Sequence, residues 1–112
     1  MALAEELPIY KACYDLVLAI FNLAKNFKKE FKYTLGESIK NEAIAAVTNI
    51  FRANISEDKK KHLAKARENI ELIRLYVRLL KDLHQINAKQ LVYINSHIEN
   101  VSKQLTGWYK SQ

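Results

Sequence analysis

The scarcity of chain-breaking residues is the feature that most constrains how this sequence can fold. Its 112 residues include only two glycines and one proline, and Pro8 stands near the start. Hairpin-rich β-structure needs such residues in its turns, so long stretches without them favour helices. With 49% hydrophobic and 27% charged residues, the chain resembles a globular protein and is long enough for one core. We therefore predict a single all-α domain over residues 1–112.

Apolar residues recur at three- and four-residue spacing in four segments, which is typical of amphipathic helices. The predicted helices cover residues 8–27, 34–54, 56–84 and 87 to the C-terminal region, with a connector at residues 28–33. In the last segment the apolar positions are Leu91, Ile94, Ile98, Val101, Leu105 and Trp108. Such a seam suits a left-handed bundle. The prediction is an antiparallel, up-and-down four-helix bundle with short loops.

Three polar residues have the spacing of helix caps. Thr34 with Glu37, and Asn87 with Gln90, have the form of a capping box, in which each side chain bonds the other residue's backbone N–H. Ser56 is predicted to cap the third helix.

The apolar surface exceeds what one bundle core needs. On the third helix the apolar arc is roughly twice the ~100° of an ordinary core-facing stripe. The first helix carries a second stripe at Tyr10, Tyr14, Val17 and Phe21. One interpretation is a well-buried central helix with a few exposed aromatic residues. The other, which we favour, is a subunit interface in a homo-oligomer.

The charge and the single cysteine limit the partners and the compartment. A formal net charge of +6 favours nucleic acid, an acidic protein or an anionic membrane surface as partner. Cys13 alone cannot form an internal disulfide, which fits a reducing compartment. No apolar run approaches the ~18 residues of a membrane span, and the first six residues are acidic where a signal peptide would be basic. We expect a cytoplasmic protein without a membrane partner.

Five basic residues of the third helix fall within an arc of about 60° that only Glu71 interrupts. This cation row comprises Lys60, Arg67, Arg74, Arg78 and Lys81. The last helix carries a comparable line at Lys89, Lys103 and Lys110. Cations along a helix suit a phosphate backbone. The alternative is a solvated face with pairs such as Glu71 with Arg74 and Arg78.

Catalytic residue patterns are absent from the sequence. The three histidines, His62, His84 and His97, have no metal-ligand spacing to one another or to Cys13. Cys13 lies on an apolar stripe and should be a buried thiol, and Trp108 continues the helical seam. We predict a binding protein that is not an enzyme and uses no metal or cofactor.

Three stretches, FKYTLGESI at 31–39, LIRLYVRLLKDL at 72–83 and LTGW at 105–108, together resemble the accessory variability determinant (Avd) proteins of diversity-generating retroelements. The resemblance also places the chain within the wider group to which these proteins belong, the four-helix proteins encoded in intervening sequences of bacterial large-subunit ribosomal RNA genes. The resemblance implies a homopentamer that binds the retroelement's reverse transcriptase, RNA and DNA during mutagenic retrohoming. It also implies that Arg74 and Arg78 of the cation row are functional.

A second function stays open at this point. The chain could be a scaffolding bundle of the ribosomal intervening-sequence group, without a reverse-transcriptase partner. A reverse-transcriptase gene and a template repeat beside this gene would favour the first function.

Overall fold

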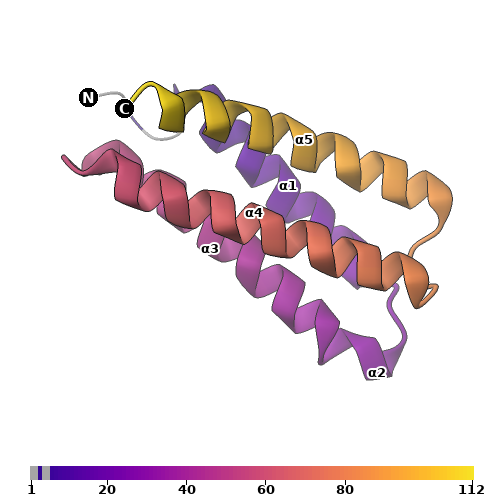
Figure 1. Ribbon diagram of the computed structural model, residues 1–112. Helices are drawn as coiled ribbons and strands as arrows, with labels where there is room; N and C mark the ends of the chain where they lie inside the picture. Colours follow the sequence, from indigo (N-terminus) through magenta and orange to yellow (C-terminus); the bar gives the residue numbers. More distant parts are fainter. Residues whose placement is uncertain (1–2, 4–5) are drawn as a thin grey trace.

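The computed structural model describes residue 3 and residues 6–112, which form a bundle of four long helices and one short helix (Figure 1). The helices are α1 (Pro8–Ala24), α2 (Lys29–Lys32), α3 (Leu35–Ile55), α4 (Lys59–Asp82) and α5 (Ala88–Lys110). Successive long helices run in opposite directions, and α1 packs against both α3 and α5, which closes the bundle. The predicted all-α four-helix fold is confirmed. The acidic N-terminal stretch lies mostly outside the described residues.

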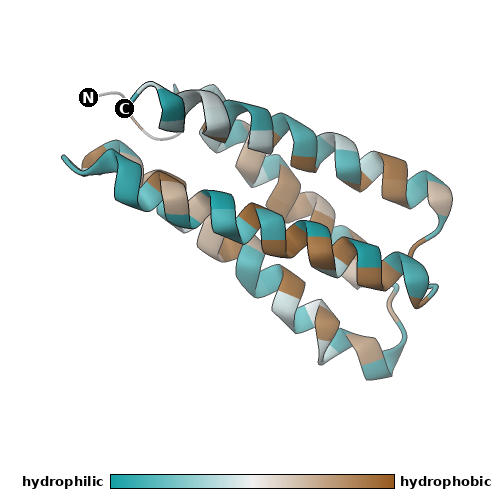
Figure 2. Cartoon of the chain, viewed as in Figure 1, coloured by the Kyte–Doolittle hydropathy of each residue, from teal (hydrophilic) through white to brown (hydrophobic). Residues whose placement is uncertain are grey.

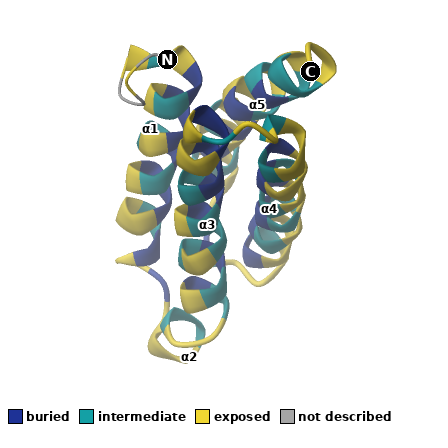
Figure 3. Ribbon diagram, turned by 90° about the vertical axis from the view of Figure 1, so that its left-hand side faces the viewer, coloured by how far each residue is buried: buried dark blue, intermediate teal, exposed yellow. Residues whose placement is uncertain are grey.

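Each long helix turns one apolar stripe towards a common core (Figure 3). The predicted seam of α5 is fully buried at Ile94, Ile98, Val101 and Leu105. Burying an aliphatic side chain of this size stabilises the fold by about 1.5–3 kcal/mol. The buried face of α3 includes three alanines, Ala43, Ala46 and Ala53, and these small side chains allow the close approach of α3 to α4. Periodicity therefore located the core correctly.

Two successive side-chain hydrogen bonds, which we call the polar relay, join α3 to α4. The buried Asn49 side chain donates from Nδ2 to Oδ1 of Asn69 (2.9 Å), and Nδ2 of Asn69 donates to Oε2 of Glu42 (2.9 Å). A buried amide without a partner would cost about 1–3 kcal/mol. Because the relay is satisfied in only one alignment of the two helices, we expect it to fix their register.

Two of the three predicted helix caps are wrong. The Thr34 hydroxyl donates to the carbonyl oxygen of Glu30 (3.0 Å), so it bonds to α2 and does not cap α3. The Ser56 hydroxyl oxygen accepts from the Asp58 N–H (3.1 Å) within the loop. Because of this turn, α4 begins at Lys59, later than predicted. Its N-cap is Asp58, whose carboxylate accepts from the Lys61 N–H.

The third predicted cap is confirmed. Asn87 Oδ1 accepts from the Gln90 N–H, and Gln90 Oε1 accepts from the Asn87 N–H, both at 2.8 Å. This reciprocal pair satisfies two of the N–H groups that the first turn of a helix leaves free. It sets where α5 starts.

The ends of two helices also differ from the prediction. The first helix ends at Ala24, and Phe27 beyond it folds into the core with only 4% of its surface exposed. The predicted connector contains the short helix α2. Helix α4 ends at Asp82, followed by His84 with a positive φ of 60°. The apolar periodicity continues beyond both helices. At α1 the chain leaves the helix so that Phe27 can be buried, and at α4 the turn at His84 ends the helix.

Side-chain contacts tie the loops to the helices. The Lys59 ammonium donates to the carbonyl oxygens of Ala53, Asn54 and Ser56 at 3.0–3.1 Å, and so satisfies the C-terminal end of α3. The Lys28 N–H donates to Oε1 of Gln85 (2.8 Å), which joins the α1–α2 connector to the α4–α5 loop.

Many apolar side chains stay exposed on the bundle. Figure 2 shows that hydrophobic residues are frequent in the C-terminal half of α4. The exposed side chains include Tyr14, Leu18 and Phe21 on α1, Ile44, Phe51 and Ile55 on α3, Leu75 and Leu79 on α4, Leu83 directly after α4, and Val92 and Tyr93 on α5. The wide apolar arc of α4 therefore divides into a buried half and an exposed half. In the part of the chain that the structure describes, no helix is long and apolar enough to cross a membrane.

Candidate nucleic-acid interface

The cation row lies along the side of α4 that borders α5. Along the sequence, its members lie between the buried residues of α4, which include Ile70, Ile73 and Val77. Arg67, Arg74, Arg78 and Lys81 each follow directly after a buried residue, so they flank the core face of α4, and they line hollows together with residues of α5 in a groove between the two helices. We call this the α4–α5 groove.

At one end of the groove, two cations of the row contact an aromatic ring of α5. Nζ of Lys60 lies 5.0 Å and Cζ of Arg67 lies 4.5 Å from the centre of the Tyr109 ring. Cation–π contacts at exposed sites stabilise by about 0.5–1 kcal/mol each. They hold both side chains against α5 and leave their charge without a carboxylate partner among the described residues.

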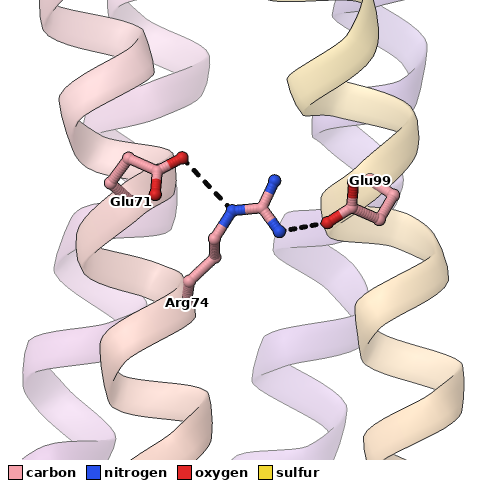
Figure 4. A network of polar contacts seen from close by, with 3 residues as sticks. All are labelled: Glu71, Arg74 and Glu99. Atoms are coloured by element: carbon pink, nitrogen blue, oxygen red, sulfur yellow. Dashed lines mark hydrogen bonds and ion pairs between the residues drawn. The ribbon is translucent and has the colours of Figure 1, made fainter.

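In the middle of the groove, Arg74 bridges the two helices (Figure 4). Its Nε pairs with Oε1 of Glu71 on α4 at 3.2 Å, and its Nη1 pairs with Oε1 of Glu99 on α5. The hydrogen bond from Arg74 lowers the pKa of the Glu99 carboxyl, and the same bond raises the pKa of Arg74. The pair between Glu71 and Arg74 that the alternative interpretation predicted is therefore present, and Glu99 is a second carboxylate partner that the sequence did not predict.

Beyond this bridge the groove widens into a hollow of about 530 Å³. Arg74, Arg78 and Lys81 line it together. Neither Arg78 nor Lys81 forms an ion pair within the described residues, so the predicted pair between Glu71 and Arg78 is absent there. A smaller hollow of about 280 Å³, beside Arg67 and Glu71, lies on the other side of the bridge. The structure therefore brings the three C-terminal cations of the row into one site and sets the other two apart at Tyr109.

The second line of cations stays outside the groove. Lys89, Lys103 and Lys110 are all exposed on α5. Their spacing puts them on the outer face of that helix. They add positive charge near the groove and do not line either hollow.

The side chains that could support catalysis do not assemble. The Cys13 thiol is buried, and burial raises its pKa to about 12, which makes it a poor nucleophile. The His97 ring contacts Tyr93 edge-on at 4.9 Å between centres. Among the described residues, no three histidine, cysteine or acidic side chains form a group that could hold a metal ion.

Sequence reasoning missed the α5 side of the groove. Glu99 and Tyr109 fall off the apolar seam of α5, and no motif distinguishes them from other surface residues. Their positions beside Arg74 and Arg67 depend on the rotation of α5 relative to α4, which a pattern in either helix alone does not fix. The spacing of ten residues between them, close to three helical turns, was the only available signal.

The bundle and its groove define a class: a small, basic four-helix protein with a cation-lined groove between two adjacent helices. The family model described as bAvd-like matches residues 7–112, and the chain belongs to this family. Membership confirms the resemblance drawn from the three motifs and is consistent with an Avd-type accessory protein of retroelements. The relation to the ribosomal intervening-sequence group remains a prediction. No curated protein matches the chain.

Proposed function

We propose that this chain is a non-enzymatic accessory subunit of a diversity-generating retroelement. It binds the reverse transcriptase of the element and its template RNA or cDNA, and so supports mutagenic retrohoming. The observation that carries the proposal is the cation row along the α4–α5 groove, in a chain of the bAvd-like family.

The charge of the groove favours a polyanion. Lys60 and Arg67 are held at one end by an aromatic ring, and Arg78 and Lys81 have no ion pair within the described chain at the other. Basic side chains arranged in a row neutralise successive phosphates and release the counterions that surround them. Contacts of this kind position a strand without reading its bases. We therefore expect sequence-tolerant binding of both RNA and DNA.

Salt dependence tests the nucleic-acid part of the proposal. Affinity for a labelled RNA or DNA oligonucleotide, measured by fluorescence anisotropy, should fall steeply between about 50 and 200 mM salt because phosphate contacts dominate. An affinity that does not change over this range would contradict the proposal.

Substitution of two arginines tests the site. Arg74 and Arg78 project from adjacent turns of α4 and neither is buried, so replacing both by alanine should preserve the core. The slope of log affinity against log salt should become shallower by up to about two, one for each lost phosphate contact. A double lysine variant should retain nucleic-acid binding better than reverse-transcriptase binding, since only arginine offers a planar fork for a carboxylate.

The readouts are thermal melting, RNA binding and pull-down of the reverse transcriptase. Melting shows whether the fold survives. If the double alanine variant unfolds, the two arginines are structural and this assignment is wrong. Full binding of both partners by a folded double alanine variant would be equally contradictory.

A further inference from the structure

The larger hollow of the α4–α5 groove combines charge with an apolar floor. Arg78, Lys81 and Asp82 stand on its α4 side, Leu91 supplies apolar surface beside the buried Val77, and Asn95 offers a side-chain amide. Its volume, about 530 Å³, lies in the range of small-molecule sites. A groove that bound only the phosphate backbone of a nucleic acid would need basic side chains but no apolar surface.

Glu99 occupies part of the same hollow. Its carboxylate binds Arg74 from the α5 side, while Glu71 holds the guanidinium from the α4 side (Figure 4). Glu99 therefore stands where an incoming anion would meet Arg74. The Glu99 side chain is largely exposed, with 65% of its surface accessible, so it can leave without disturbing the core.

We propose that this hollow accepts one nucleotide of a bound strand, and that Glu99 competes internally with its phosphate for Arg74. Phosphates of the strand lie among Arg74, Arg78 and Lys81, the base or sugar covers Leu91, and Asn95 donates to the nucleoside. The inference rests on the proposed function and names the site at which one unit of the strand is held.

The mixed lining of the hollow favours a nucleotide over a carboxylate of an acidic peptide. Replacing the Glu99 carboxylate by another single carboxylate exchanges one ion pair for a similar one. A phosphodiester also carries one charge on two unesterified oxygens, but a strand brings a second phosphate that can reach Arg78 and Lys81, and a base or sugar that can cover Leu91. These two cations have no carboxylate partner in the described part of the chain. The gain at Arg78 and Lys81 is what displaces Glu99.

The test compares two glutamate variants of the full chain. Glu99→Gln removes the competitor and frees Arg74. Glu37→Gln is the matched control, because Glu37 pairs with Lys40 on α3 at 3.0 Å, so this change adds the same charge and frees a cation away from the groove. Binding of a labelled RNA oligonucleotide at low salt should be about three- to fivefold tighter for Glu99→Gln than for Glu37→Gln, the factor that one exposed ion pair corresponds to.

Two further measurements locate the effect. Adding Arg74→Ala to Glu99→Gln should remove the gain, since the gain comes from the released guanidinium. In the unsubstituted protein, the side-chain amide resonance of Asn95 should shift when RNA is added. Melting temperatures close to that of the unsubstituted chain show that the variants are folded.

The outcomes separate this inference from the proposed function. If the unsubstituted chain binds RNA but Glu99→Gln binds no tighter than Glu37→Gln, the inference fails and the proposed function stands. An unshifted Asn95 amide in the RNA complex would also overturn it. If no variant binds RNA at any salt concentration, both fail.

Discussion

The ion pair between Arg74 and Glu99 has a measurable effect on the pKa of Glu99. Because Arg74 stabilises the ionised form of Glu99, the pKa of this carboxyl is lowered in the folded chain relative to the unfolded chain. A group with a lowered pKa contributes stability that is present at neutral pH and is lost as the pH falls through its folded-state value. The pair should therefore be intact at physiological pH and break only in acid.

We predict that the Glu99 carboxyl titrates below the ordinary range of glutamate. Carbon-detected NMR during an acid titration would measure the midpoint directly. In an Arg74→Ala variant the midpoint should return to the ordinary range, because the hydrogen bond and the charge are both removed. Identical midpoints in the two proteins would show that the bridge does not persist in solution.

His84 is the second residue with a distinct physical role. Its φ of 60° is in the left-handed region, where it ends α4. The Gln85 N–H donates to the carbonyl of Leu80 (2.8 Å) and the His84 N–H to that of Lys81 (3.1 Å), which is the bond pattern of a Schellman motif. A side chain in this conformation is strained by roughly 1–2 kcal/mol relative to glycine.

We expect His84→Gly to raise the free energy of unfolding by about 0.5–1 kcal/mol, since relief of strain exceeds the entropy that glycine adds to the unfolded chain. Urea unfolding followed by circular dichroism would measure the change. A destabilised variant would mean that the imidazole makes a stabilising contact that outweighs the strain.

At the scale of elements, the two glycines of the chain have opposite roles. A Cβ added at Gly36, in the first turn of α3, would lie 3.0 Å from the carbonyl oxygen of Phe31, so glycine allows α2 to pack closely there. A Cβ added at Gly107, in the last turns of α5, would meet no atom within 4 Å. Only at Gly36 does the packing depend on the absence of a side chain.

The two alanine variants form a matched pair. Gly107→Ala should stabilise the protein by about 0.5–1 kcal/mol because alanine is the better helix former. Gly36→Ala gains the same helix propensity, but its added Cβ would push the Phe31 carbonyl oxygen away. We therefore expect this change to destabilise the fold. Thermal unfolding of both variants would check this. Equal stabilisation by both changes would show that α2 moves aside freely.

At the scale of the whole molecule, the bundle presents two different surfaces. The groove between α4 and α5 is lined with charges, whereas exposed apolar side chains gather on the outer sides of α1, α3 and α4. Monomeric proteins rarely leave contiguous apolar patches of large area in water. We therefore predict that copies of the chain associate through the apolar surface and leave the groove accessible.

We predict that the protein is a homo-oligomer, with five copies of the 13.0 kDa chain giving about 65 kDa. Light scattering at micromolar concentration measures this mass. Replacing Leu75 and Leu79 by glutamate should lower the mass, because charge would be buried in the interface and the core of the bundle is untouched. The same change at Val92, an exposed apolar residue of α5 with polar neighbours one turn away, is the control. A mass of 13 kDa for the unsubstituted chain would contradict the prediction.

Much of this molecule could be predicted from local sequence. Apolar periodicity gave the four helices and their buried stripes, as at Ile94 and Ile98, because a helix of fixed pitch allows only one set of positions to face inwards. The capping box at Asn87 was predictable for the same reason, since its bonds lie within a single turn. The row from Lys60 to Lys81 was also visible as a line on one helix.

Tertiary structure decided what these residues meet. Thr34 and Ser56 have the sequence of caps, yet each forms another hydrogen bond that the neighbouring α2 or loop offers. The pair between Glu71 and Arg74 is local to α4, but the rotation of α5 brings Glu99 against Arg74 and joins the two helices. Side-chain pattern along one helix is a local property, whereas the pairing of charges between helices depends on how two rigid elements pack.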